Sequence, residues 1–177
     1  MVDTKSNQED INSSILEDAR IGYQAAIQLW TYEGGQNWAR FNVMLVANSI
    51  IIAVLGLAIT SANPSTAISV VLSVVGVILC IAWFLITKRG FDYQKYYVLS
   101  ARELEEKFLS KVITTASRGG AFADGKPVSI EIGGAPKKIR MGWWSRKTSA
   151  GNISIIVILL FAVVYVFALL QVILKIS

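Results

Sequence analysis

The fold of this chain is decided by residues 41–86, which read FNVMLVANSIIIAVLGLAITSANPSTAISVVLSVVGVILCIAWFLI. Two apolar stretches lie in it, 41–60 and 67–86, and neither contains Lys, Arg, Asp or Glu. A third such stretch, ISIIVILLFAVVYVFALLQVIL, occupies residues 153–174. About 20 residues of α-helix cover roughly 30 Å, which is the thickness of the hydrocarbon core of a bilayer. The sequence therefore predicts three transmembrane helices, of which the first two form a hairpin over 41–87.

The composition supports a membrane protein and argues against an enzyme. Of the 177 residues, 54% are hydrophobic and only 16% are charged, whereas soluble domains carry about 25% charged residues. The chain has no histidine and one cysteine, Cys80, which lies inside the second apolar stretch. Because histidine is the commonest base and metal ligand, and the acidic residues are scattered, we expect no catalysis, no metal and no other cofactor.

The distribution of basic residues predicts the orientation in the membrane. Residues 88–150 hold 13 of the 17 Lys and Arg residues, and the turn 61–66 holds none. Since cytoplasmic flanks of transmembrane helices are enriched in Lys and Arg, we expect a multi-pass protein of the inner (plasma) membrane with a cytoplasmic N-terminus and an outside C-terminus. The first stretch lacks a nearby cleavage site, so the N-terminus is expected to be retained. Four tryptophans fall at the predicted cytoplasmic ends, where indole rings favour the headgroup region: Trp38, Trp83, Trp143 and Trp144.

The remaining residues predict a cytoplasmic helical stalk and a small β-hairpin. Residues 1–12 are polar, acidic and without period, and are expected to be a disordered tail. An amphipathic helix is predicted over 13–40, with Gly34-Gly35 as a candidate bend, and its apolar stripe is expected to pack against a second stripe over 93–112. The other face of that second helix carries Glu103, Glu105 and Glu106, and Arg118-Gly119-Gly120 is expected to end it.

Residues 127–141 have a different hydrophobic pattern from the helix before them. Val128, Ile130 and Ile132 alternate with polar residues before a Gly-rich turn, and the following strand is basic, which is typical of a β-hairpin. Residues 88–150 are thus predicted to form a cytoplasmic helix plus a basic β-hairpin. The predicted fold class is an all-α integral membrane protein with three transmembrane helices, a cytoplasmic helical stalk and this small hairpin.

Small residues recur at spacings of four, three and four in both hairpin spans. In lipid, such stripes let helix backbones approach closely. One interpretation is that they only pack the hairpin of a single chain, which is the preferred one, and the other is that one stripe also contacts a second subunit. The helix-packing residues are Ser49, Ala53, Gly56 and Thr60 in the first span, and Ser69, Ser73, Gly76 and Cys80 in the second.

Two further groups of residues are candidates for function. In the functional interpretation, four polar residues form a gate or line a pore: Glu33, Arg40, Asn42 and Asn48. In the structural interpretation, Arg40 binds lipid phosphates and Asn48 makes an interhelical hydrogen bond. For the basic segment 126–147, the preferred binding partner is anionic lipid headgroups, and the second is a cytoplasmic anion such as a nucleotide. Nucleic acid is the least favoured partner. The residues expected to make these anion or lipid contacts are Arg118, Lys137, Lys138, Arg140, Arg146 and Lys147.

The layout of residues 13–112, with the stretch Trp30…Glu33…Trp38…Arg40…Asn42, resembles the small membrane effectors of prokaryotic antiphage defence, especially the SLATT type. That family pairs a two-helix membrane hairpin with cytoplasmic helices on both sides. The third span and the basic hairpin depart from this design. The resemblance implies a self-assembling protein that permeabilises the inner membrane when an infection sensor signals.

Two functional hypotheses from different classes remain open. In the first, the chain is a homo-oligomeric, pore-forming or membrane-permeabilising effector that is triggered through its cytoplasmic region. In the second, it is a non-conducting membrane anchor or accessory subunit that recruits a cytoplasmic partner protein through helices 13–33 and 92–113. An intramembrane enzyme is the least favoured hypothesis.

Overall fold

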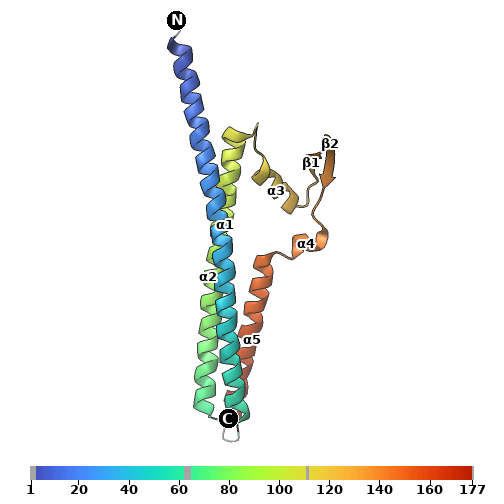
Figure 1. The fold of residues 1–177 in the computed structure, drawn as a ribbon. Helices are drawn as coiled ribbons and strands as arrows, with labels where there is room; N and C mark the ends of the chain where they lie inside the picture. Colours follow the sequence, from blue (N-terminus) through green and yellow to red (C-terminus); the bar gives the residue numbers. More distant parts are fainter. Residues whose placement is uncertain (1–2, 62–64, 111, 177) are drawn as a thin grey trace. The chain divides into compact units, whose positions relative to one another are not determined.

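Three long helices dominate the structure (Figure 1), a computed structural model that describes residues 3–61, 65–110 and 112–176, with side chains for 12–61, 65–110 and 112–174. Segments long and apolar enough to cross a membrane lie within Asn12–Thr60, Thr66–Leu109 and Ala150–Leu174. The predicted fold class, an α-helical membrane protein with three apolar helices and one small hairpin, is confirmed. The elements in chain order are α1 (Asp3–Thr60), α2 (Thr66–Leu104), the π-helix η1 (Glu105–Leu109), α3 (Thr115–Ala123), β1 (Val128–Ile132), β2 (Ala135–Ile139), α4 (Trp143–Lys147) and α5 (Ala150–Ile176).

The chain divides into two compact units. The first comprises Met1–Gly34 and Asp92–Ser149, and the second comprises Gly35–Phe91 and Ala150–Ser177. Because α1 and α2 are each continuous, both helices contribute to both units.

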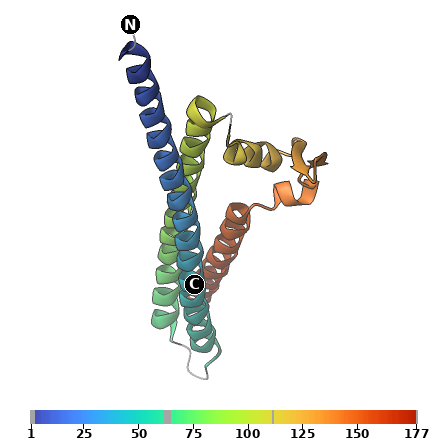
Figure 2. The same ribbon diagram turned by 45° about the horizontal axis from the view of Figure 1, so that its top comes forward.

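The second unit is a three-helix bundle made from parts of α1 and α2 and from α5, which run side by side in Figures 1 and 2. Its buried core takes residues from all three helices, namely Phe41, Leu55, Cys80, Trp83, Ile158, Tyr165 and Ala168. The backbones of α2 and α5 approach closely at Gly76, where an added Cβ would collide with the Tyr165 ring. The third span therefore packs directly on the predicted hairpin, which is how this unit covers the second span.

The first unit joins the N-terminal part of α1 to the C-terminal part of α2. Ala26 of α1, Ala101 of α2 and Ala116 of α3 form a small buried cluster, with Tyr23 and Ile27 packed against it. A Cβ at Gly22 would lie only 3.2 Å from Leu104 Cδ1, so the two helices are in close contact there. Small side chains at these positions are the physical reason that the two stripes can meet.

The hairpin lies beyond α3 (Figure 2). β1 and β2 are antiparallel, with Val128 opposite Ile139 and Ile132 opposite Ala135. The connecting Gly133 and Gly134 have φ angles of 62° and 80°, which are left-handed values that glycine adopts without strain. A two-residue turn with positive φ at both positions matches the twist of the strands, so the hairpin is confirmed.

Several boundaries differ from those predicted. The structure makes 13–40 and 41–60 parts of one helix and extends that helix back to Asp3, where a disordered tail was expected; Met1 and Val2 lie outside the described residues. Propagation adds a hydrogen bond per residue, and each glycine costs only about 1 kcal/mol, so Gly34-Gly35 does not interrupt α1. The prediction that Arg118-Gly119-Gly120 ends the second helix is wrong, because these residues lie inside α3.

Candidate functional site

A buried carboxylate organises the first unit. The Glu105 side chain, at the start of η1, is only 1% exposed. Its Oε1 accepts hydrogen bonds from the Tyr23 hydroxyl at 2.9 Å and from the Ala116 backbone N–H at 2.7 Å. Its Oε2 accepts one from the Ser117 backbone N–H at 2.8 Å. Ala116 and Ser117 lie in the first turn of α3, so Glu105 caps that helix and places a negative charge at its positive end.

Glu105 lies four residues after buried Ala101 and so shares its face, and the π-helix that begins at Glu105 changes which residues are buried after it. Ala101, Glu105 and Leu109 are buried at spacings of four, whereas Phe108 is 45% exposed and Val112 is 73% exposed. An α-helix would have continued the stripe through Phe108 and Val112, but hydrogen bonding between residues five apart underwinds the helix and moves the buried face. The prediction that Glu105 lies on the solvent face is therefore wrong. The signal that could have found it was the 101-105-109 spacing.

The contacts of Glu105 determine the charge states of Glu105 and Tyr23. Burial alone would raise the pKa of the Glu105 carboxyl, but the hydrogen bonds from Ala116, Ser117 and Tyr23 favour the carboxylate and lower that pKa from 4.5. The pKa of Tyr23 is raised to about 12, first by burial and then by its hydrogen bond to the Glu105 carboxylate and that group's charge. At neutral pH the pair consists of an ionised glutamate and a neutral tyrosine.

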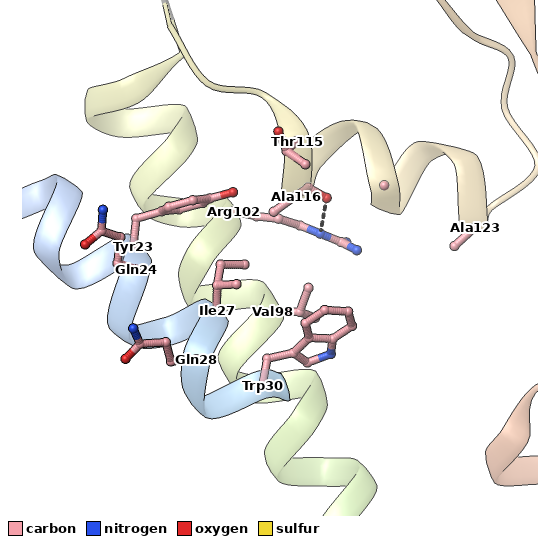
Figure 3. A pocket seen from close by; sticks show the side chains of 11 residues that line it. Tyr23, Gln24, Ile27, Gln28, Trp30, Val98, Arg102, Thr115, Ala116 and Ala123 are labelled. Atoms are coloured by element: carbon pink, nitrogen blue, oxygen red, sulfur yellow. Dashed lines mark hydrogen bonds between the residues drawn. The ribbon is translucent and has the colours of Figure 1, made fainter. Parts of the chain in front are cut away.

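A cavity of about 760 Å³ shares Tyr23 and Ala116 with this carboxylate site. Its walls come from α1, α2 and α3, all within the first unit. Arg102 crosses from α2 toward α3 and donates from Nε to the Ala116 carbonyl oxygen at 3.1 Å (Figure 3). Gly120 makes room for this side chain, because any Cβ there would collide with the guanidinium group. No sequence pattern indicates a role for Arg102, since one basic residue on an amphipathic helix is usually solvated.

The four candidate gate residues are in different environments. Glu33 belongs to the first unit and is partly buried, whereas Arg40 and Asn42 belong to the second unit and are exposed on α1. Asn48 is fully buried inside the bundle. In the described part of the chain, no three His, Cys, Asp or Glu side chains gather in a way that could hold a metal ion.

Asn48 sits in a polar cluster within the apolar bundle. Its Nδ2 donates to the Met44 carbonyl oxygen at 2.8 Å. The Tyr165 hydroxyl of α5 lies 3.0 Å from the Asn48 carbonyl oxygen and 3.2 Å from its Oδ1. The Cys80 thiol of α2 donates to the same Oδ1 at 3.7 Å. The amide thus links three helices of one chain, which is the interhelical hydrogen bonding expected in the structural interpretation of Asn48. Nothing in the sequence indicated Tyr165 as its partner.

The two small-residue stripes have opposite surroundings. In α2, all four members are buried: Ser69, Ser73, Gly76 and Cys80. In α1, all four are exposed on the outside of the second unit: Ser49, Ala53, Gly56 and Thr60. A Cβ added at Gly56 would have no atom within 4 Å. Only the α2 stripe packs the bundle of one chain, and the α1 stripe leaves an open face.

The six basic residues predicted to contact anions or lipid all lie in the first unit, on α3, on β2, on α4 and in the link between β2 and α4. Arg118, Lys137 and Lys138 are exposed. Arg140 donates from Nε to the Gly125 carbonyl oxygen at 2.8 Å, and Arg146 contacts the Asp124 carbonyl oxygen at 3.4 Å, so both also brace the connection after α3.

Of the tryptophans predicted to lie at the headgroup level, Trp38, Trp143 and Trp144 are exposed, and Lys147 Nζ lies 4.4 Å from the centroid of the Trp143 ring. Trp83 differs, because it is fully buried between Phe41 and Phe161, with ring centroids 5.2 Å and 6.0 Å away. The expectation for Trp83 is therefore wrong. Its position at the end of a span did not reveal that α5 covers it.

Comparison with known proteins agrees with a membrane protein. No curated protein and no solved structure matches the chain. One family model does match, and it covers residues 22–174, which include the buried carboxylate, the cavity, the hairpin and all three apolar helices. The chain belongs to the octameric membrane protein family (8xMP).

Proposed function

We propose that the chain assembles into a homo-octamer that permeabilises the membrane, and that it acts as a non-enzymatic effector in prokaryotic antiphage defence, triggered through its first unit. The observation that carries this proposal is the open face of α1, lined by Ser49, Ala53, Gly56 and Thr60, in a chain whose family is octameric. Lipid offers no hydrophobic gain for helix association, so a face that permits close backbone approach favours contact with another helix.

A ring of identical subunits explains how such a small bundle could form a passage. Within one chain the bundle core is filled by Leu55, Trp83 and Tyr165, and the polar Asn48 is bonded inside it. A passage would therefore lie between copies. Head-to-tail contacts that close on themselves generate such rings.

The proposed orientation places the first unit in the cytoplasm and the chain in the inner membrane. The support is the concentration of 13 of the 17 Lys and Arg residues in 88–150. Four exposed basic residues suit contact with anionic headgroups: Lys137, Lys138, Arg146 and Lys147, the last two beside the exposed Trp143 and Trp144. Each basic residue contributes about 1 kcal/mol of attraction near the membrane surface.

Leakage of dye from proteoliposomes tests the proposal. Gly56→Leu places bulk on the open face of α1, and we expect it to reduce leakage and the population of the largest oligomer together. Val54→Leu is the matched control, because it adds a methylene at similar depth on a different exposed face of α1. Purified octamers that leave liposomes and the cellular membrane potential intact after activation would contradict the pore.

A non-conducting anchor is the second candidate. It is supported by large apolar side chains exposed on the N-terminal part of α1, where Ile15, Leu16 and Ile21 are 41–57% exposed. Such a face suits a cytoplasmic partner protein. This alternative predicts a stoichiometric complex with another protein and no leakage, and replacing Ile15 and Ile21 by Ser should abolish the complex.

A further inference from the structure

The cavity in the first unit has the dimensions and the chemistry of a small-molecule site. Its volume of about 760 Å³ falls within the roughly 300–1,000 Å³ that ligand pockets occupy. The lining is mostly apolar or aromatic, with Ile27, Val98, Tyr23 and Trp30 among its members. Of the lining residues, Arg102 alone carries a full charge. An apolar chamber with one convergent charge favours a ligand with an apolar body and one anionic group.

Arg102 is oriented for such a group. Its Nε donates to the Ala116 carbonyl oxygen, and in the described part of the chain it has no acidic partner. Glu105 is near in sequence, but its carboxylate oxygens are bonded to Tyr23, Ala116 and Ser117. The two terminal nitrogens of a guanidinium held in this way can bind a carboxylate or phosphate through two parallel hydrogen bonds.

Trp30 indicates the shape of the body. Figure 3 shows its indole ring next to Val98 and on the same side of the helices as the Arg102 guanidinium, facing the space beneath α3. Flat indole faces stack on planar rings, and this contact is worth about 1–3 kcal/mol for a nucleobase. Gly119 contributes no side chain to the wall, and nothing lies within 4 Å of the Cβ it would carry. The chamber is therefore left open opposite the two long helices.

We propose that this cavity binds a planar aromatic molecule with one anionic group, the ring against Trp30 and the carboxylate or phosphate on Arg102. A nucleoside monophosphate and an aromatic carboxylate share this chemistry. A single arginine does not match the charge of a polyphosphate, and an acyl chain cannot stack on the indole face as a planar ring does. The inference concerns binding alone, so it stands whether or not the protein permeabilises a membrane.

Binding to the full chain in detergent tests the proposal, by calorimetry and by the shift of the unfolding temperature. The probes are adenosine 5′-monophosphate and 2-naphthoate, with adenosine, inorganic phosphate and octanoate as partial ligands. We expect at least one aromatic anion to bind, and each partial ligand to bind at least about tenfold more weakly, because each lacks either the charged hydrogen bonds or the stacking. Which of the two aromatic anions binds more tightly distinguishes a nucleotide from an aromatic acid.

Three variants locate the site. Arg102→Gln should weaken binding at least about tenfold, whereas Lys95→Gln removes one positive charge from an exposed position of α2 outside the cavity and should bind as the parent does. Gly119→Leu keeps Arg102 and its hydrogen bond but adds a bulky side chain to the α3 wall of the cavity, so it should weaken binding even if Arg102→Gln fails to fold. The proposal is overturned if neither aromatic anion binds, if octanoate binds as tightly, or if a folded Gly119→Leu binds normally.

Discussion

Glu105 is the residue on which the first unit depends most. Its carboxylate is buried, accepts three hydrogen bonds and joins α1, η1 and α3. A buried charge without a cationic partner is costly unless donors surround it. Here two backbone N–H groups at a helix start and one phenol supply that environment.

Removing single members of this group should be measurable. Tyr23→Phe deletes one hydrogen bond to a charged acceptor and should cost about 1.5–3 kcal/mol, and Glu105→Ala should cost more because it also leaves the Ala116 and Ser117 N–H groups uncapped. Thermal unfolding in detergent measures both. Glu106→Ala, on the exposed neighbouring position, is the control and should change the unfolding temperature little.

Glu105 and Tyr23 also predict the pH range in which their hydrogen bond stabilises the folded protein. The pKa of Glu105 is lowered in the folded state, so its contribution is complete above the unfolded value of 4.5 and is lost as pH falls through the folded value. The pKa of Tyr23 is raised, so its contribution is complete below 10.0 and is lost as pH rises toward about 12. The difference in unfolding temperature between the parent and Glu105→Ala should be greatest between these limits. A constant difference from pH 3 to pH 12 would contradict the assignment.

Individual helices show what a sequence pattern can and cannot establish. The charge-free lengths of the three spans and the alternation before Gly133-Gly134 predicted the helices and the hairpin, because length and period are local properties. The two stripes of small residues have the same spacing, so nothing local indicated that α2 buries its stripe while α1 exposes its own. That distinction depends on the position of α5. The hydrogen bonds of Glu105 and the cavity at Arg102 depend likewise on the return of α3.

Replacing either of two glycines by alanine should have opposite effects on stability, because only Gly76 lies at the contact between α2 and α5. Gly76→Ala forces a methyl group into the Tyr165 ring, so the helices must separate and the polar cluster at Asn48 must loosen. We expect a loss of about 1–3 kcal/mol, as for overpacked cores. Gly35→Ala has open space around it and should stabilise α1 by up to about 1 kcal/mol. Equal unfolding temperatures for the two variants would show that this contact is absent.

At the scale of the whole molecule, the open face of α1 and the family assignment together predict an assembly of eight chains. The particle in mild detergent should have a protein mass eight times the 19.4 kDa of one chain, measurable by native mass spectrometry. Gly56→Leu should shift the mass toward smaller species while the helix content stays unchanged, because a Cβ added at Gly56 would have no atom of the chain within 4 Å. A full-size assembly of Gly56→Leu would place the subunit contact elsewhere.

The burial of Cys80 makes the natural protein ready for site-directed chemistry. Its thiol is 2% exposed and is the only one in the chain, so maleimide reagents should leave the folded protein unmodified. Reporter cysteines can then be introduced one at a time without an engineered cysteine-free background. Impermeant reagents applied to intact cells would reveal which end of each span faces the medium, and oxidative cross-linking between neighbouring copies would identify the residues at the subunit contact.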